Sequence, residues 1–231
     1  YVTLLLTGDG ANGVQNNTYV DSSTNNFSIS RNGNPTQGSF SPYGSNWGNY
    51  FNGSNSELTC TGSALSGQFT MEGWIFYTAT PSSGMTYFGI SGSNGGFLRQ
   101  ESSSQISFLH AGIDIDLTGS FTPVVGTWYH LAVTRNASNL MTIWVNGSSV
   151  GSGTVATSYS SGTFAVGANH YSGGTTGYFS GYISNVRLVT GSCLYTSSFT
   201  PSTTPLTAVS GTQILTCQSN RFIDNSSNNY S

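Results

Sequence analysis

Only 6% of the 231 residues are charged, the five basic ones are all arginines, and the formal net charge is −3. This charge balance excludes a nucleic-acid-binding protein, which needs dense basic charge to neutralise phosphates. No stretch approaches the roughly 20 consecutive apolar residues of a membrane-spanning helix. Aromatic residues make up 13% of the chain, and turn-forming Gly, Ser, Thr and Asn are abundant. The composition therefore predicts an ordered all-β domain that works outside the reducing cytoplasm or on a virus particle.

Short alternating apolar runs recur along the chain, separated by clusters of Gly, Ser, Asn and Thr, which is the pattern of an all-β fold. We expect strands at 2–7, 26–31, 50–51, 57–59, 68–78, 86–91, 96–100, 105–110, 112–117, 128–135, 141–145, 149–152, 163–167, 177–189 and 212–217. About fifteen short strands in one domain predict two packed sheets rather than a single open sheet.

The clearest local unit covers residues 128–150. Two alternating runs, Trp128–Arg135 and Leu140–Val145, flank the polar turn 136–139. The dipeptide Asn146-Gly147 follows, and Asn-Gly supplies the positive φ angles of a type I′ hairpin. We expect three consecutive antiparallel strands here.

Five segments in this order resemble the laminin-G-like, concanavalin A-like jelly-roll domains. They are Leu4–Leu6 with Asp21–Asn26, Tyr50–Gly53 with Leu58, Phe69–Ile75, Gly126–Arg135 with Trp144–Gly147, and Phe179–Leu188. The run Leu-Thr-Cys-Gln-Ser-Asn-Arg-Phe-Ile-Asp at 215–224 is similar to domains of bacteriophage tail and fibre proteins and of large secreted surface proteins. The resemblance implies an all-β, two-sheet antiparallel jelly-roll sandwich, but it does not imply one activity.

The end of the chain repeats its beginning. Residues 18–28 align without gaps to residues 221–231, and Leu5–Thr7 aligns to Ile214–Thr216. We therefore assign residues 1–217 to the jelly-roll domain and 218–231 to a tail that repeats the entry motif, as in one unit of a tandem array or self-complementing filament. Since the family's first and last strands lie side by side, the tail has no place left in the domain. We expect it to lead into or dock on a neighbouring copy; a disordered tail is the alternative.

Catalytic residues are hard to find in this sequence. Glycoside hydrolysis needs two carboxyl groups roughly 5–10 Å apart, and the catalytic jelly rolls that the chain resembles carry Glu-x-Asp-x-Glu or a near variant on one strand. Glu72 stands alone on its strand, while Asp114 and Asp116 share a strand face without a Glu nearby. His130 fits a structural position in a core strand. We predict that the protein is not an enzyme.

Calcium is the cofactor that the sequence allows, because Asp, Asn and backbone carbonyls are its preferred ligands. The resemblance implies an ion at a sheet rim. Asp114 with Asp116 is the first candidate pair, and Asp9 with Asn12 is the second. The alternative for Asp9 is an Asx turn within its own loop.

Loop aromatic residues beside polar side chains could bind a glycan, since sugars pack on aromatic faces. The first cluster consists of Tyr43, Trp47 and Tyr50, and the second of Tyr159, Asn169, His170, Tyr171 and Tyr178. The alternative for both is rim packing or contact between subunits. Trp74, Trp128 and Trp144 lie at strand positions and are assigned to the core.

Three cysteines, Cys60, Cys193 and Cys217, leave at least one without an intramolecular disulfide partner. The sequence allows either a Cys193–Cys217 bridge or three free thiols.

The leading functional hypothesis is a non-enzymatic structural and adhesive module of an extracellular appendage, such as a phage fibre, virion surface or secreted filament, acting in repeated copies. A lectin-like domain that recognises surface glycans is the alternative, and a glycoside hydrolase is less favoured. The expected partners are copies of the chain and surface polysaccharide, with no nucleic acid and no membrane insertion.

Overall fold

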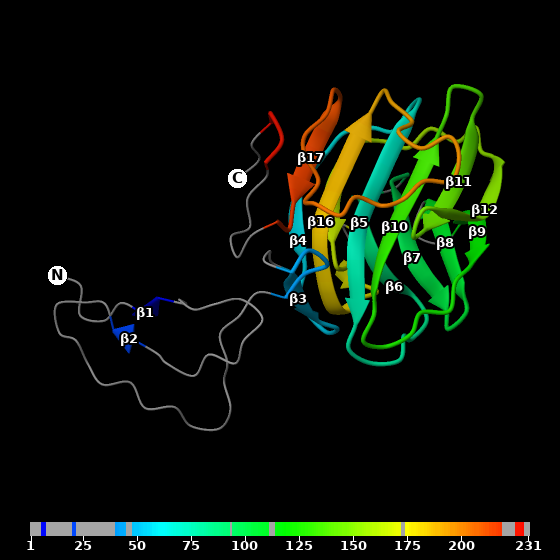
Figure 1. Ribbon diagram of the computed structural model, residues 1–231. Coiled ribbons are helices and arrows are strands. Elements are labelled where there is room, and N and C mark those ends of the chain that lie inside the picture. Colours follow the sequence, from blue (N-terminus) through cyan, green and yellow to red (C-terminus); the bar gives the residue numbers. More distant parts are fainter. Residues whose placement is uncertain are drawn as a thin grey trace.

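The computed structural model describes residues 6–7, 20–21, 40–44, 48–92, 94–110, 114–171, 174–218 and 225–228. These residues form strands and no helix, so none of them belongs to a helix that could cross a membrane. Two large antiparallel sheets pack face to face (Figure 1). The all-β, two-sheet antiparallel sandwich expected from the sequence is confirmed.

Each large sheet follows one path of hydrogen-bonded strands. The seven-stranded sheet runs β12 (Ser148–Thr154), β11 (Leu140–Val145), β10 (Trp128–Arg135), β5 (Phe69–Tyr77), β16 (Ser180–Thr190) and β17 (Thr212–Thr216), with β3 (Asn49–Asn52) also paired to β16. The six-stranded sheet runs β4 (Leu58–Gly62), β13 (Gly162–Val166), β6 (Met85–Ser91), β7 (Gly96–Ser102), β8 (Gln105–His110) and β9 (Asp114–Ser120). Two small strand pairs join β1 (Leu6–Thr7) to β2 (Val20–Asp21) and β14 (Asn169–Tyr171) to β15 (Gly174–Thr176).

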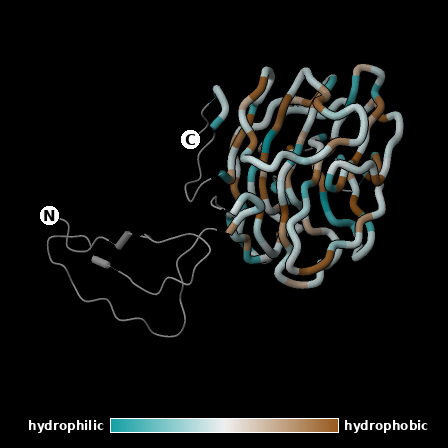
Figure 2. Tube along the Cα trace, viewed as in Figure 1, coloured by the Kyte–Doolittle hydropathy of each residue, from teal (hydrophilic) through white to brown (hydrophobic). Residues whose placement is uncertain are grey.

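The hydrophobic core lies between the two large sheets and follows the period of two that strands impose. Along β5, Met71 and Ile75 belong to the core cluster together with Leu131 and Val133 of β10. The apolar positions of the sandwich strands appear as brown bands in Figure 2. The residues that alternate with them on β5 and β10 therefore face the outer side of the seven-stranded sheet.

The outer side of that sheet is covered by the segment between β16 and β17. Residues 192–207, here called the strap, cross the sheet in orange in Figure 1. The hydroxyl of Thr70 donates to the Ser192 carbonyl at 3.1 Å, and the hydroxyl of Thr134 donates to the Tyr195 carbonyl at 3.3 Å. The strap therefore buries the outer face of β5 and β10 from Thr70 to Glu72 and from His130 to Thr134, while Trp74 and Trp128 stay partly exposed.

The hairpin predicted at 128–150 is present. β10 pairs with β11 and β11 pairs with β12, all antiparallel. Asn146 and Gly147 have φ angles of 48° and 79°, so both central residues of this turn are left-handed, as a type I′ turn requires.

The chain ends differ from the sequence-based expectation. Within the described residues β1 pairs with β2, whereas β17 pairs with β16, so β1 and β17 are not neighbours. The amide of Asn225 donates to the Leu215 carbonyl at 2.6 Å, and the hydroxyl of Ser226 donates to the Gln213 carbonyl at 2.8 Å. Residues 225–228 thus contact β17 of their own domain, and the expectation that the tail leads into or docks on a neighbouring copy stays a prediction.

Candidate functional site

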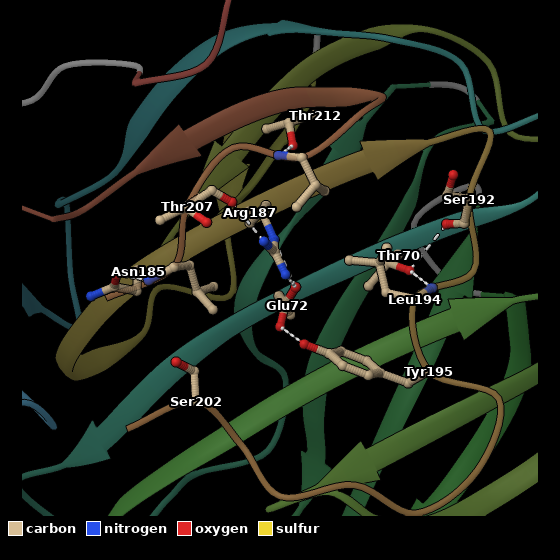
Figure 3. Close-up of polar contacts among 12 residues, drawn as sticks. Thr70, Glu72, Asn185, Arg187, Ser192, Leu194, Tyr195, Ser202, Thr207 and Thr212 are labelled. Atoms are coloured by element: carbon tan, nitrogen blue, oxygen red, sulfur yellow. Dashed lines mark hydrogen bonds and ion pairs between the residues drawn. The ribbon is translucent and has the colours of Figure 1, made fainter. Parts of the chain in front are cut away.

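A charged cluster lies beneath the strap, on the outer face of the seven-stranded sheet (Figure 3). Glu72 of β5 is fully buried. Its Oε1 accepts a hydrogen bond from Arg187 Nε of β16 at 2.9 Å. Its Oε2 accepts bonds from His130 Nε2 of β10 at 3.0 Å and from the Tyr195 hydroxyl of the strap at 2.8 Å. Three neighbouring strands and the strap therefore meet at one carboxylate.

The electrostatics of this cluster favour an ionised carboxylate. Burial alone would raise the pKa of Glu72, but the hydrogen bond and charge of His130, the charge of Arg187 and the hydrogen bond from Tyr195 together hold it below its usual value. Burial, reinforced by the charge of Glu72 and the hydrogen bond to it, raises the pKa of the Tyr195 phenol. Both groups keep their ordinary neutral-pH forms, and the cluster fastens the strap to the sheet.

The strap is also held against the turn between β11 and β12. The Phe199 amide donates to the Gly147 carbonyl at 3.0 Å, and a Cβ on Gly147 would lie only 1.7 Å from the Phe199 carbonyl oxygen. The rings of Tyr195 and Phe199 stack with centroids 3.6 Å apart. The strap is therefore held in place by a backbone hydrogen bond to this turn and by the stacking of its own aromatic side chains.

A groove opens between the strap and the turn formed by residues 40–44. Its volume is about 380 Å³, and it is lined by Pro42, Tyr43, Trp74, Trp128, Asn146, Pro201, Ser202 and Thr203. The two prolines and Tyr43 form part of its walls, and both tryptophans project from the sheet. None of these lining residues carries a charge.

The aromatic rings of the groove continue into a band across the outer face. Tyr43 meets Trp74 edge to face with centroids 5.7 Å apart. Trp128 packs against Phe40 at 5.4 Å, and Phe40 packs against Tyr182 at 4.7 Å. Burial raises the pKa of the Tyr43 phenol to about 12, with the Trp74 indole acting in the opposite direction.

The three tryptophans of this sheet differ in their indole N–H groups. Trp144 donates to the Thr134 hydroxyl at 2.9 Å. The N–H groups of Trp74 and Trp128 are buried without a well-formed hydrogen bond, and so is the Tyr43 hydroxyl. The two tryptophans without a well-formed indole hydrogen bond are the two that line the groove.

Two members of the first predicted aromatic cluster, Tyr43 and Tyr50, lie in this band. Tyr43 lines the groove. Tyr50 is 56% exposed and packs on Tyr182 with centroids 5.2 Å apart. Trp47 lies outside the described residues.

Two members of the second predicted cluster, Tyr159 and Asn169, are buried. Tyr159 is 1% exposed and packs between Phe69 and Phe108, so its assignment to a sugar-binding loop surface is corrected. Asn169 is buried, and its side-chain oxygen accepts a bond from the Ser91 hydroxyl at 3.1 Å.

The other members of that cluster stay candidates for glycan contact. His170 is half-buried, and its Nδ1 lies 3.2 Å from Glu57 Oε1. Tyr178 is half-buried as well. The side chain of Tyr171 lies outside the described part of the chain.

The predicted calcium pair splits into two environments. Asp116 accepts hydrogen bonds from the Tyr159 hydroxyl at 2.7 Å, His110 Nδ1 at 3.0 Å and the Thr157 hydroxyl at 3.3 Å. The side chain of Asp114 is 63% exposed and lies 3.7 Å from His110 Nε2. No group of three or more His, Cys, Asp or Glu side chains in the described residues could hold a metal ion. Asp9 and Asn12 lie outside the described residues.

Trp74 and Trp128 are the groove residues that the sequence analysis missed, because it assigned them to the core. They lie instead on the opposite face of β5 and β10 from the core cluster, and each is only partly buried. The polar Thr70 and Glu72, in phase with Trp74 on β5, are the sequence signal that this face is separate from the core.

None of the three cysteines forms a disulfide in the described part of the chain, so the Cys193–Cys217 bridge is absent there. Burial raises the pKa of the Cys217 thiol to about 12. The Cys193 thiol donates to the Tyr195 carbonyl at 3.3 Å, and burial raises its pKa as well. The Cys193 and Cys217 thiols are therefore protonated packing groups at neutral pH.

Comparison with known proteins bears on the fold. A family model described as the concanavalin A-like lectin/glucanases superfamily, of laminin G type, matches residues 52–193. None of the curated proteins matches the chain.

Several solved structures are similar to this chain. A Bacteroides ovatus protein, provisionally described as carbohydrate-binding, has a TM-score of 0.56 at 16% identity, covering 80% of this chain and 56% of its own. Domains LG4-5 of the mouse laminin α1 chain have a TM-score of 0.48 at 19% identity, covering 71% and 44%. Tailspike protein 2 of an Escherichia coli O157:H7 bacteriophage has a TM-score of 0.45 at 15% identity, covering 63% and 23%. The chain thus spans about half or less of each of these proteins.

Proposed function

Because this chain belongs to the concanavalin A-like lectin/glucanases superfamily, a fold that hosts binding as well as catalysis, we propose that it is a non-enzymatic module that binds neutral glycans in the groove on its outer face. The observation that carries the proposal is the uncharged groove with two tryptophans on the sheet and a tyrosine in its wall.

The lining has the chemistry of a sugar site. The C–H faces of a pyranose ring pack on aromatic rings, and its hydroxyls need hydrogen-bonding groups at the edge. Trp74, Trp128 and Tyr43 supply the rings, while Asn146 and Ser202 supply polar groups. An uncharged lining favours a neutral saccharide over a sialylated or sulfated one.

The unsatisfied N–H groups supply a second reason. Trp128 holds a buried N–H donor without a hydrogen-bond partner among the described residues, and the Trp74 N–H meets the Tyr43 hydroxyl without a well-formed hydrogen bond. A sugar hydroxyl that reaches them when the Tyr43 side chain turns aside would recover the cost of those buried donors. Binding then includes a small rearrangement of residues 40–44.

The absence of catalysis is part of the proposal, and two observations support it. Glu72 is sealed beneath the strap with both carboxylate oxygens occupied by Arg187, His130 and Tyr195. Asp116 accepts three hydrogen bonds from protein donors. Neither carboxyl group is free to serve as the general acid or base that glycoside hydrolysis requires.

The proposed setting is an extracellular appendage or virion surface, where the domain would attach a larger assembly to surface polysaccharide. The low charge and the motif repeated at the two chain ends support such a structural role in repeated copies. The carbohydrate-binding description of the Bacteroides ovatus protein is consistent with it.

The test is a glycan array of neutral and acidic oligosaccharides, followed by calorimetric titration of the best ligand. We expect Trp74→Phe and Trp128→Phe each to weaken binding about tenfold, because each loses a donor and ring area worth about 1.4 kcal/mol. Trp144→Phe is the matched control: it removes the same atoms on the same sheet, but from an indole already bonded to Thr134, so binding should be unchanged.

Two outcomes would overturn the proposal. One is a wild-type chain that binds no glycan on the array. The other is a ligand whose affinity is unchanged in both groove variants or falls equally in the Trp144 variant. Release of reducing sugar from the bound glycan would contradict the non-enzymatic part alone.

A further inference from the structure

Four aromatic residues form a regular row across the seven-stranded sheet. Tyr50 of β3 stands opposite Tyr182 of β16, and Tyr182 stands opposite Phe76 of β5. Phe76 in turn stands opposite Trp128 of β10. Residues that stand opposite each other on paired strands lie on the same face of a sheet. Four neighbouring strands, in the order β3, β16, β5 and β10, therefore each contribute one ring to what is here called the aromatic row (Figure 1).

The aromatic row lies on the outer face of this sheet. The residues that alternate with it along three of the strands, Phe51, Ile75 and Ile183, all belong to the core cluster between the sheets. Since successive side chains of a strand point to opposite faces, the four rings point away from that core. Tyr50 is 56% exposed, and the other three members of the row are partly buried.

Phe40 packs on the aromatic row and joins its members. The centroid of its ring lies 4.6 Å from that of Phe76, 4.7 Å from that of Tyr182 and 5.4 Å from that of Trp128. The rings of Tyr50 and Tyr182 lie 5.2 Å apart. Phe40 is itself 40% exposed. A continuous band of touching rings therefore runs from Tyr50 to Trp128, with both Tyr50 and Phe40 open to solvent.

Trp128 connects this band to the groove, because it is the last member of the row and also lines the groove. Neighbouring strands of a sheet lie about 4.8 Å apart, so the three spacings from β3 to β10 span about 14 Å. This length exceeds that of one pyranose ring. A single sugar bound in the groove would therefore leave Tyr50 untouched.

Polar groups accompany the row along one side. Asn52 and Ser180 stand opposite each other on β3 and β16, two positions from Tyr50 and Tyr182, and so lie on the same outer face. Asn52 is exposed and Ser180 is half-buried. Aromatic faces beside uncharged amide and hydroxyl groups are the surroundings that the C–H faces and the hydroxyls of a neutral sugar require.

We infer that the aromatic row extends the groove, and that the ligand is a linear, neutral glycan of several sugar units that runs across the strands from Trp128 to Tyr50. This inference rests on the proposed function and adds the length and the direction of its ligand. One sugar unit occupies the groove, and the following units pack on Phe40, Tyr182 and Tyr50. Because each strand contributes one ring, the row is one ring wide, which suits an unbranched chain.

The test compares two lengths of the same glycan by calorimetric titration of the full chain. The probes are cello-, malto-, manno- and xylo-oligosaccharides, each as the disaccharide and as the hexasaccharide. We expect the hexasaccharide of at least one series to bind at least about tenfold tighter than its disaccharide, because the added units pack on further rings.

Tyr50 is the residue that separates the two lengths, because it lies at the end of the row away from the groove. Tyr50→Thr removes the ring but keeps a residue that favours strands. It should weaken binding of the hexasaccharide about fivefold and leave binding of the disaccharide unchanged. A hexasaccharide also gains affinity because it offers several overlapping disaccharides, but the variant keeps that gain, so the difference reports the ring alone.

Two further variants serve as controls. Tyr50→Phe keeps the ring and should bind both lengths as the wild type does. Ile115→Ala removes an apolar side chain that is 47% exposed on the six-stranded sheet, and it should change neither affinity. An unchanged Tm of Tyr50→Thr shows that the loss of affinity does not come from unfolding of β3.

The outcomes distinguish this inference from the proposed function. Equal affinity of the two lengths, or a Tyr50→Thr chain that binds both as the wild type does or weakens both alike, contradicts the extended site. So does an absence of binding to every hexasaccharide when the array has found another glycan whose binding depends on Trp74 and Trp128. In each of these cases the groove remains a glycan site. A chain that binds no glycan at all contradicts both proposals.

Discussion

Glu72 and Arg187 are 115 positions apart in the chain, yet they stand opposite each other on β5 and β16, where the guanidinium Nε donates to the Glu72 Oε1 at 2.9 Å. The two side chains are 0% and 7% exposed. A buried pair of this kind adds little over a well-packed apolar pair, but the loss of one partner leaves an uncompensated charge in a dry site. Loss of either residue should therefore destabilise the sheet together with the strap, which forms one wall of the groove.

Replacement of Glu72 tests this dependence. Glu72→Gln should lower the free energy of unfolding by about 3–5 kcal/mol, measured by urea denaturation. Glu101→Gln is the control, because Glu101 pairs with Arg99 at 2.7 Å where both side chains are about a fifth exposed. That variant should lose less than about 1 kcal/mol. Losses of similar size in the two variants would contradict the assigned role of the buried cluster.

The same carboxylate predicts an acid limit on stability. The pKa of Glu72 in the folded protein lies below the ordinary value of 4.5, so below that pH the unfolded chain takes up the proton first. The contribution of this group to stability is therefore complete above about pH 4.5 and is lost as the pH falls toward the folded pKa. Calorimetric Tm values between pH 6 and pH 3 should fall more steeply for the wild type than for Glu72→Gln. Parallel curves would contradict the prediction.

The strands that were predicted most accurately carry local signals. The bounds Trp128–Arg135 and Gln105–His110 match β10 and β8, because period-two alternation marks their length and turn residues mark their ends. The turn at Asn146-Gly147 was predictable for the same reason, since its conformation depends on two adjacent residues.

The groove could not be predicted from local signals. Its walls come from residues 40–44 and from the strap, which meet Trp74 and Trp128 only after folding. The alternation of residue types along a strand indicates which residues share a face of the sheet. It does not indicate which face packs into the core when both faces of the sheet are covered. Glu72 lies on the same strand face as Trp74, and its charge indicates that this face is not the core. Its partner Arg187 could not be predicted, because the pairing of β5 with β16 depends on the sheet topology.

Removal or addition of calcium should leave the stability of the β8–β9 region unchanged, because the Asp116 carboxylate is already occupied by Tyr159, His110 and Thr157. We expect Asp116→Asn to cost about 1–3 kcal/mol and Asp114→Asn less than about 0.5 kcal/mol. Both differences should be equal in chelator and in millimolar calcium. A Tm that rises with calcium in the wild type but not in Asp114→Asn would instead establish a site at this pair.

The contact between Gly147 and the strap links stability to ligand binding. Gly147→Ala places a methyl group against the Phe199 carbonyl oxygen in addition to the cost of a left-handed φ of 79°. Gly126→Ala isolates the second effect, because Gly126 has a φ of 82° and open space around its Cβ position. We expect the control to lose about 1–2 kcal/mol.

Gly147→Ala should lose more than this control, because the backbone of the strap must move away from the turn. Pro201, Ser202 and Thr203 belong to the strap and line the groove, so the displacement should also weaken glycan binding, whereas Gly126→Ala should leave it unchanged. Urea denaturation and calorimetric titration of the two variants measure both effects. Equal losses of stability, or a Gly147→Ala chain that is destabilised but binds glycan as the wild type does, would show that the strap does not shape the groove.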